Sequence, residues 1–371
     1  MYEQNIREDI LYLMFYAGVT VLNLIACFYL FFRRANAITP GITPPVRLRR
    51  WTAAFLGAAA LSHTWYTPIL YLTSAEDIKM VYFVGGVLDF LTVFPLAIAV
   101  LFCMLQDRSR PLWPIGVMVA PLVVGLAICV FTCSDAILPV LYVYFLLLTF
   151  GLIIYMVRET RKYGRWLHDN YADLEHKEVW QSLLVLAIIL IGFSLYAFTL
   201  QNVFYMYASQ VNVIILTCFL VWRTETLSDL SQWDCESHST DAGEETVTME
   251  NDLSQPIQGK IGQLLERHCK EPQLYLWHDL TAQQLAKAVG TNRYYLSQYF
   301  AQQGITYNAY INELRIDHFI SLYRKAVAAR HPFTVKQLAE DSGYRNYTTF
   351  SNAFKQRMGK NVTAWMLDND A

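Results

Sequence analysis

The side chains most able to do chemistry in the first half of the sequence are two ionisable residues within long apolar runs. Asp89 is the only Asp, Glu, Lys or Arg inside any of these runs, and His63 is the only histidine. His63 lies nine residues before Leu72, and Asp89 lies nine residues after Met80, on the two sides of the short segment 73–79. If both runs are helical, each residue lies about 14 Å from that segment, because a helix rises 1.5 Å per residue. Neighbouring antiparallel helices are therefore expected to bring His63 and Asp89 together.

A His–Asp pair at this depth can bind a polar ligand or exchange a proton. A charged group in hydrocarbon costs about 2.5–3.5 kcal/mol on insertion scales, and such residues usually have a partner and a function. Asn23 and Asn212 add amide groups at neighbouring depths, and Pro68, one turn from His63, is expected to kink its helix. We predict a ligand or signal site at His63, Asp89, Asn23 and Asn212. The alternative is a buried pair that only fixes helix packing.

Motifs of enzymes and metal sites are absent from the sequence. It contains no H-E-x-x-H, no G-x-S-x-G and no C-x-x-C, and its last apolar run has no lysine for a Schiff base. Five of the seven cysteines lie in apolar runs, while Cys235 and Cys269 fall in segments expected to face the reducing cytoplasm. We therefore expect no enzymatic activity, no disulfide, no metal and no cofactor.

Near the C-terminus, the chain twice repeats a short helix, a glycine-containing turn and a second helix. In the first unit AQQLAKAV ends at Gly290, and Asn292 is a good N-cap for RYYLSQYFAQQ. In the second unit VKQLAEDS ends at Gly343, and Asn346 or its neighbour opens YTTFSNAFKQRM. The longer helix YNAYINELRIDHFISLYRKAVAA connects the two units. This is the helix-turn-helix arrangement, in which the second helix of a unit enters the major groove of DNA.

Helical spacing divides each second helix into a core face and an outward face. The core positions are Tyr295, Leu296, Tyr299 and Phe300 in the first helix, and Phe350 and Phe354 in the second. The outward positions carry Arg293, Tyr294, Ser297 and Gln298, and then Tyr347, Thr348, Ser351 and Asn352. Guanidinium, amide and hydroxyl groups hydrogen-bond to base edges and phosphates. We predict these eight outward residues as DNA contacts.

The pieces LAKAVGTNRYYLSQYF, YNAYINELRI and VKQLAEDSGYRNYTTFSNAFKQRMGKNVTAW resemble the AraC/XylS family of bacterial transcription regulators over about residues 280–366. Two spaced units with a matching connector make the resemblance specific. It implies an all-helical domain whose two recognition helices enter successive segments of the major groove. It also implies Arg315 and Lys355 as DNA contacts, RNA polymerase as a partner, and activation rather than repression.

Three positions depart from the family pattern. The family often has arginine where this sequence has Gln298 and Asn352, and lysine where it has Ala301. Amides pair best with adenine edges, each good pair discriminating by about 1–3 kcal/mol, whereas arginine prefers guanine. We therefore expect an operator richer in A·T at those two amides, bound with weaker salt dependence.

Seven apolar runs precede this domain, each about the 20 residues that a helix needs to cross a bilayer. They cover residues 10–32, 52–72, 80–105, 112–133, 136–157, 182–202 and 205–222. Twelve Lys and Arg flank these runs on one side, and only Arg7 and Lys79 flank them on the other. Because positively charged loops stay in the cytoplasm, we expect the N-terminus outside, and residue 223 onward in the cytoplasm, of a bacterial inner membrane.

Charge divides the 371 residues into three regions. Residues 1–223 carry 15 Lys and Arg against 13 Asp and Glu, residues 224–255 carry none against nine, and residues 256–371 carry 14 against nine. We predict a transmembrane sensor domain over 1–223, an acidic flexible linker over 224–255 and a basic DNA-binding domain over 256–371. The expected fold class is all-α, a seven-helix bundle followed by a helical domain with two helix-turn-helix units. The charged stretch 158–180 is expected to be a solvated helical extension, with a transmission element as the alternative.

These features predict a membrane-anchored, one-component transcription regulator. Its expected partners are double-stranded promoter DNA, the lipid bilayer, a second copy of the chain, and a small-molecule or envelope signal that the sequence does not name. A small-solute transporter or channel with a regulatory cytoplasmic domain is disfavoured by the single intramembrane charge and the lack of an internal repeat. A protein-interaction module that has lost DNA binding is disfavoured by the outward polar residues of both recognition helices.

Overall fold

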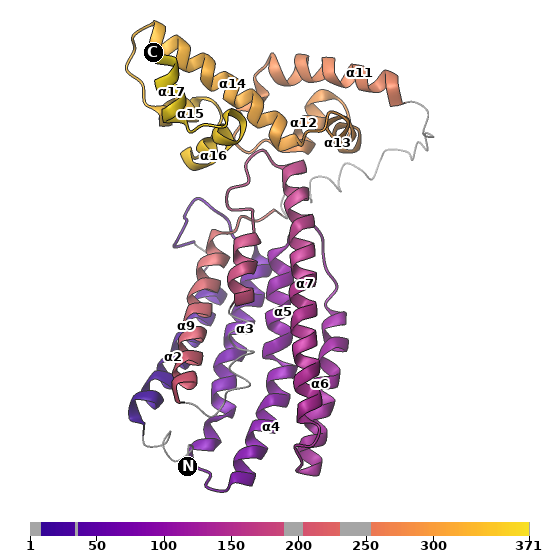
Figure 1. Cartoon of the computed structure of the whole chain (residues 1–371), viewed down its shortest axis with the longest axis vertical. Helices are drawn as coiled ribbons and strands as arrows, with labels where there is room; N and C mark the ends of the chain where they lie inside the picture. Colours follow the sequence, from indigo (N-terminus) through magenta and orange to yellow (C-terminus); the bar gives the residue numbers. More distant parts are fainter. Residues whose placement is uncertain (1–8, 34–35, 189–202, 231–253, 371) are drawn as a thin grey trace. The chain divides into compact units, whose positions relative to one another are not determined.

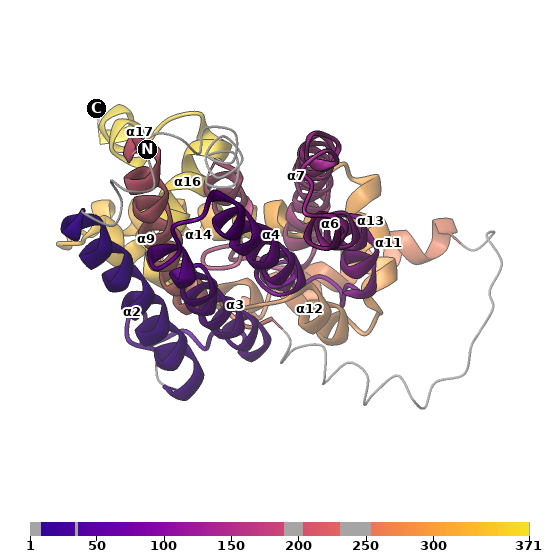
Figure 2. The same ribbon diagram turned by 90° about the horizontal axis from the view of Figure 1, so that it is seen from below.

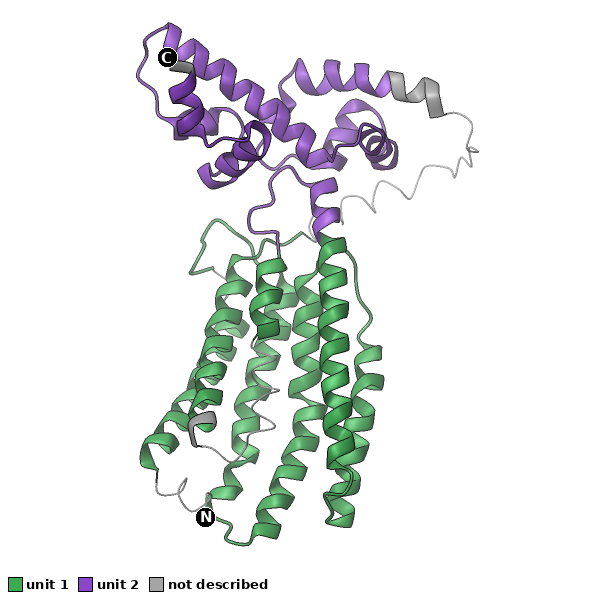
Figure 3. Ribbon diagram, in the orientation of Figure 1, with its two compact units in different colours: residues 1–163, 179–242 green, residues 164–178, 243–371 purple. Residues whose placement is uncertain are grey.

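The computed structural model describes residues 9–33, 36–188, 203–230 and 254–370. Within these ranges the regular elements are helices, which confirms the all-α class, and an isolated β-bridge joins Tyr171 to Thr281. The chain forms two compact units (Figure 3). Unit 1 comprises residues 1–163 and 179–242, and unit 2 comprises residues 164–178 and 243–371.

Unit 1 is a bundle of long helices that run side by side (Figures 1 and 2). Its named helices are α2 (Ile10–Phe32), α3 (Val46–Trp65), α4 (Ala75–Leu91), α5 (Val93–Met104), α6 (Trp113–Thr132), α7 (Leu138–Asn170) and α9 (Val203–Thr226). α3 packs against α2 and α5, α2 also packs against α9, and α4 packs against α6. Large apolar side chains such as Phe31, Phe131 and Leu147 lie exposed on the outside of the bundle. Exposed apolar surface of this extent fits helices surrounded by lipid rather than water.

Five candidate spans among the described residues are long and apolar enough to cross a membrane: α2, α4 together with α5, α6, α7 and α9. The second predicted run, 52–72, corresponds to α3, whose first turns carry three arginines that lower its hydropathy, and α3 is not among the five. The sixth run, 182–202, lies mostly outside the described residues, although residues 180–188 are helical. The number of spans therefore stays a prediction.

Prolines shift two helix boundaries from their predicted places. The second predicted run reaches residue 72, but α3 ends at Trp65 and is followed by a 3₁₀ turn over Thr67–Leu70. Pro68 causes this end, because it lacks an amide hydrogen and disfavours helical geometry at the residue before it. The third run, 80–105, is divided at Thr92. Here Pro95 cannot donate a hydrogen bond to the carbonyl four residues earlier.

The start of the predicted linker is part of unit 1. α9 runs past the predicted boundary at 223 to Thr226, and the Glu225 side chain is fully buried. Its carboxylate accepts hydrogen bonds from the Ala37 amide at 3.0 Å and the Tyr29 hydroxyl at 3.2 Å, and lies 3.9 Å from the Arg49 guanidinium. These contacts fix the chain leaving α9 against the loop that follows α2. The remainder of the predicted linker, 231–253, lies outside the described residues.

Unit 2 contains two apolar cores joined by one long helix (Figure 1). Its named α-helices are α11 (Ser254–Leu265), α12 (Ala282–Val289), α13 (Arg293–Gln302), α14 (Tyr307–Ala328), α15 (Val335–Asp341), α16 (Tyr347–Met358) and α17 (Val362–Asp370). Tyr307 and Ile311 of α14 belong to the first core, with α12 and α13. Ile316, Phe319 and Tyr323 of the same helix belong to the second, with α15, α16 and α17. α14 therefore holds the two helix-turn-helix units in a fixed relation.

Residues 164–178, which leave the bundle at the end of α7, belong to unit 2 (Figure 3). Ala172 is 1% exposed and part of the first core. The side-chain amide of Asn308, on α14, donates hydrogen bonds to the carbonyl of Tyr171 at 3.1 Å and to that of Ala172 at 2.7 Å. The prediction of a solvated extension is therefore wrong for this segment. Its amphipathic pattern did not show which surface its apolar side would cover.

Candidate nucleic-acid interface

Side-chain caps fix where α12 and the two recognition helices, α13 and α16, begin. α12 starts after Thr281, which forms a capping box with Gln284. The backbone N–H of Gln284 donates to the Thr281 hydroxyl at 3.2 Å, and the backbone N–H of Thr281 donates to the side-chain oxygen of Gln284 at 3.0 Å. α13 starts after Asn292, and α16 after Asn346; each asparagine side chain accepts a backbone N–H of the helix at 3.0 Å. The helix starts predicted at Asn292 and Asn346 are confirmed.

A glycine with positive φ lies at the turn of each unit. Gly290 ends α12 with φ of 74°, and Gly343 follows α15 with φ of 89°. A Cβ at Gly343 would lie 2.8 Å from the Leu276 Cα and 2.9 Å from its carbonyl oxygen, whereas a Cβ at Gly290 would meet no atom within 4 Å. Both turns need left-handed backbone, which glycine adopts without strain. Only Gly343 also lets another backbone segment approach the turn.

The first recognition helix, α13, presents the predicted residues to solvent. Arg293, Tyr294, Ser297 and Gln298 are all exposed, while Leu296 and Phe300 are buried. Tyr295 was predicted to point into the core, but its side chain is 37% exposed. Leu296, the next residue, is the one that enters the core at this end of α13. The predicted reading face is thus available to DNA on α13.

The second recognition helix, α16, divides in the same way. Phe350 and Phe354 are fully buried in the second core. Tyr347, Thr348 and Asn352 are exposed and Ser351 is half-buried, and Lys355 is exposed in the last turn. Amides and hydroxyls on one face, with a cation at the helix end, suit base contacts flanked by a phosphate contact. Contact of these residues with DNA stays a prediction.

Arg315, one of the predicted DNA contacts, is buried. Its side chain is 1% exposed. Nε donates to the carbonyl of Tyr275 at 2.7 Å, and Nη2 donates to the carbonyls of Trp277 at 2.6 Å and His278 at 3.3 Å. Its guanidinium also lies 5.5 Å from the ring centroid of Tyr344. Arg315 therefore joins the 275–278 turn to the second unit, and its contact with DNA stays a prediction.

Residues 285–367 match a family model described as a helix-turn-helix domain. The C-terminal domain is an AraC-type helix-turn-helix domain. The match spans both recognition helices and α14, and the DNA-binding nature of such domains agrees with the exposed polar faces described above. It does not extend to the bundle. Neither a curated protein nor a solved structure matches the chain.

The polar residues predicted within the bundle lie in two hydrogen-bonded pairs rather than one. Nε2 of His63 lies 3.0 Å from Oε1 of Gln210 on α9, and the Asp89 carboxylate accepts a hydrogen bond from the Tyr66 hydroxyl at 2.8 Å. Among the described residues no hydrogen bond or ion pair joins His63 to Asp89, although His63 lies close enough for its charge to act on the carboxylate. The sequence prediction singled out the two ionisable residues and two asparagines, and it missed the partners Gln210 and Tyr66.

Two further features shape this polar region. The ring of Tyr66 lies directly against Gly85, where any Cβ would overlap the ring, so the glycine allows Tyr66 to reach Asp89. Asn23 is fully buried and accepts a hydrogen bond from Thr217 on α9 at 2.6 Å, whereas Asn212 is half-buried. Asn23 thus fixes α2 to α9. The hydrogen bonds given for His63, Asp89 and Asn23 run to other residues, and a site shared by the four predicted residues stays a prediction.

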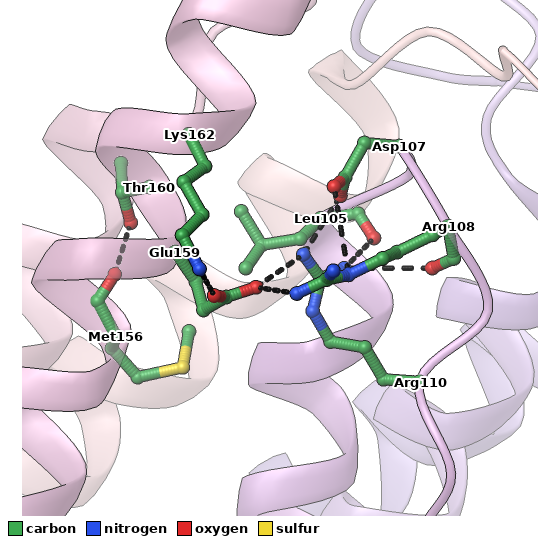
Figure 4. Close-up of polar contacts among 8 residues, drawn as sticks. All are labelled: Leu105, Asp107, Arg108, Arg110, Met156, Glu159, Thr160 and Lys162. Carbon is green, nitrogen blue, oxygen red and sulfur yellow. Dashed lines mark hydrogen bonds and ion pairs between the residues drawn. The ribbon is translucent and has the colours of Figure 1, made fainter.

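A cluster of ion pairs joins α7 to the loop that follows α5 (Figure 4). Glu159, buried on α7, accepts hydrogen bonds from Arg108, from Arg110 at 3.1 Å and from Lys162 at 2.9 Å. Arg110 also donates to Asp107 at 2.8 Å and to the Leu105 carbonyl at 2.9 Å. Charged hydrogen bonds with little exposure to water are among the stronger polar contacts in proteins. The cluster therefore fixes α7 just before its last turns enter unit 2.

Proposed function

We propose that this chain is a membrane-anchored, one-component transcription regulator of a bacterium. In this proposal the bundle lies in the cytoplasmic membrane with the N-terminus outside, and the C-terminal domain binds promoter DNA sequence-specifically in the cytoplasm. The observation that carries the proposal is the presence, in one chain, of an AraC-type domain with both reading faces exposed and of helices apolar enough to span a bilayer. RNA polymerase and a second copy of the chain are the proposed protein partners.

We assign signal detection to the polar region around Asp89 and His63. The carboxylate–phenol pair Asp89–Tyr66 connects α4 to the end of α3, and the His63–Gln210 pair connects α3 to α9. A ligand or proton that changes either pair favours one packing of these helices over another. Signalling then follows as a population shift between two arrangements of the bundle. Its size depends on the difference in affinity that the signal has for the two arrangements.

The test is genome-wide occupancy of the tagged full-length protein, with transcript levels at the bound promoters. We expect wild type to occupy a limited set of promoters, and D89N to stay inserted in the membrane but to change the output of those promoters several-fold. D135N is the matched control, because Asp135 is an exposed carboxylate that pairs with Lys79 at 2.8 Å away from the polar region. No promoter enrichment would show that the chain is not a regulator. Enrichment with unaltered output in D89N would remove Asp89 from signalling.

A further inference from the structure

Segment 164–178 contacts the first turn of the second recognition helix through one carboxylate. Oε1 of Glu175 accepts a hydrogen bond from the Asn346 side-chain amide at 2.7 Å, and Oε2 accepts one from the Thr349 hydroxyl at 3.2 Å. Asn346 is the N-cap of α16, and Thr349 is the third residue of that helix. Both oxygens of Glu175 therefore bind the end of α16 that leads into the predicted reading face.

The N-terminus of a recognition helix is also a place where DNA phosphates bind. Free backbone N–H groups and the positive end of the helix dipole attract an anion there, and helix N-termini are recurrent phosphate contacts in protein–DNA complexes. In the structure Glu175 places a carboxylate beside this helix N-terminus, where the side chains of Asn346 and Thr349 hold it. Tyr347 and Thr348, predicted to contact DNA, are its immediate neighbours on α16.

The same segment places a second carboxylate near the first recognition helix. Asp169 lies close enough to Arg293, the first residue of α13, for their charges to interact. Arg293 is one of the predicted DNA contacts. The charge of Asp169 therefore acts on Arg293, whereas Glu175 is the carboxylate that contacts a recognition helix.

Segment 164–178 is held in the domain at several points. Ala172 fills the first core, Asn308 binds two of its carbonyls, and Tyr171 forms a bridge with Thr281. Within the segment itself, Lys177 donates to the carbonyl of Asp173 at 2.9 Å. At its N-terminal end the segment is continuous with α7, which the Glu159 cluster fixes to the bundle. α7 itself continues to Asn170, so its last turns are part of the segment.

We propose that segment 164–178 is an autoinhibitory element that occupies the DNA-binding domain of its own chain. Glu175 competes with a DNA phosphate for the N-terminus of α16. DNA binds tightly once the segment has left α16, and a change in the bundle transmitted along α7 favours its release. This inference rests on the proposed function, because it requires that the domain binds DNA.

The experiment measures how tightly the full-length protein in lipid nanodiscs binds a fluorescent DNA duplex over a range of salt concentrations. The duplex has the sequence of a promoter that the protein occupies in the genome-wide experiment. We expect E175Q to bind about threefold to tenfold more tightly than wild type at low salt, because the competing charge is gone. The gain should shrink as salt rises. N308A, which removes two hydrogen bonds to the segment, should also bind more tightly. Glu178, exposed on the same segment, provides the matched control, and E178Q should stay within about twofold of wild type.

Hydrogen exchange on the same samples provides a readout that affinity alone does not. We expect the amides of residues 170–178 to exchange faster when duplex is added to wild type, because the segment leaves α16. Unaltered or weaker binding by E175Q, equal gains in E175Q and E178Q, or undiminished protection with duplex bound would each overturn autoinhibition. If neither wild type nor any variant binds duplex, the proposed function is wrong, and the inference with it.

Discussion

Arg315 and Lys355 lie in opposite environments of the same domain, although their sequence contexts assign both to DNA. Arg315 is buried and donates to three backbone carbonyls, whereas Lys355 is exposed at the end of α16. We expect R315M to lower the free energy of unfolding of the domain by about 3 kcal/mol, because it leaves those carbonyls without a donor. K355A should change stability by less than about 0.5 kcal/mol but weaken DNA binding uniformly across sequences.

Peptide-resolved hydrogen exchange of the full-length protein measures the stability of the domain, and duplex titration measures affinity. If R315M were as stable as wild type but had lost DNA affinity, Arg315 would be a DNA contact and not a structural residue. At the residue scale, helical spacing predicted the buried Leu296, Phe300, Phe350 and Phe354 and the exposed set opposite them. It could not predict the burial of Arg315, because its partners lie about forty residues earlier in the chain and belong to an irregular turn.

The turns of the two helix-turn-helix units both contain a glycine with positive φ, but only the second turn packs against another backbone segment. Substituting each glycine tests this difference. G290A introduces a side chain at φ of 74° into open space, whereas G343A introduces one at φ of 89° within 3 Å of backbone atoms of Leu276. We expect G290A to destabilise the domain by about 1–2 kcal/mol through strain alone. G343A should cost clearly more, because the 274–276 turn must also move. Equal losses in exchange protection would show that the approach to Leu276 does not constrain the turn.

Elements whose ends are set locally were predictable from the sequence. The caps at Asn292 and Asn346 confirm this, because a side chain two or three residues from its acceptor is visible in the sequence itself. The ends of α3 and the break at Thr92 were predicted less well, since an apolar run hides the effect of Pro68 and Pro95. Segment 164–178 could not be placed, because its partners Asn308 and Asn346 are more than a hundred residues away.

At the scale of the whole molecule, charge and hydropathy predicted an apolar part and a basic helical part, and the two compact units contain these parts. The exception is segment 164–178, which is encoded within the apolar part and folds with the basic one. Composition could not reveal this segment, since about fifteen residues barely change the mean charge or the mean hydropathy of either part. In the proposed autoinhibition, this segment connects the bundle to the DNA-binding domain independently of the acidic linker.

The distribution of charge at the two ends of the bundle predicts its orientation. Arg49, Arg108 and Arg110 lie at the end that carries Glu225 and Glu159, while Lys79 and Asp135 pair at the other. The acids at the first end neutralise part of its charge, yet orientation follows the positive residues and not the net charge. We therefore expect a phosphatase reporter inserted at Asp135 to be active, one inserted at Asp107 to be inactive, and a fluorescent reporter to show the reverse. Phosphatase activity at Asp107 would place the arginine-rich end outside, and with it segment 164–178 and the DNA-binding domain, where no promoter is present.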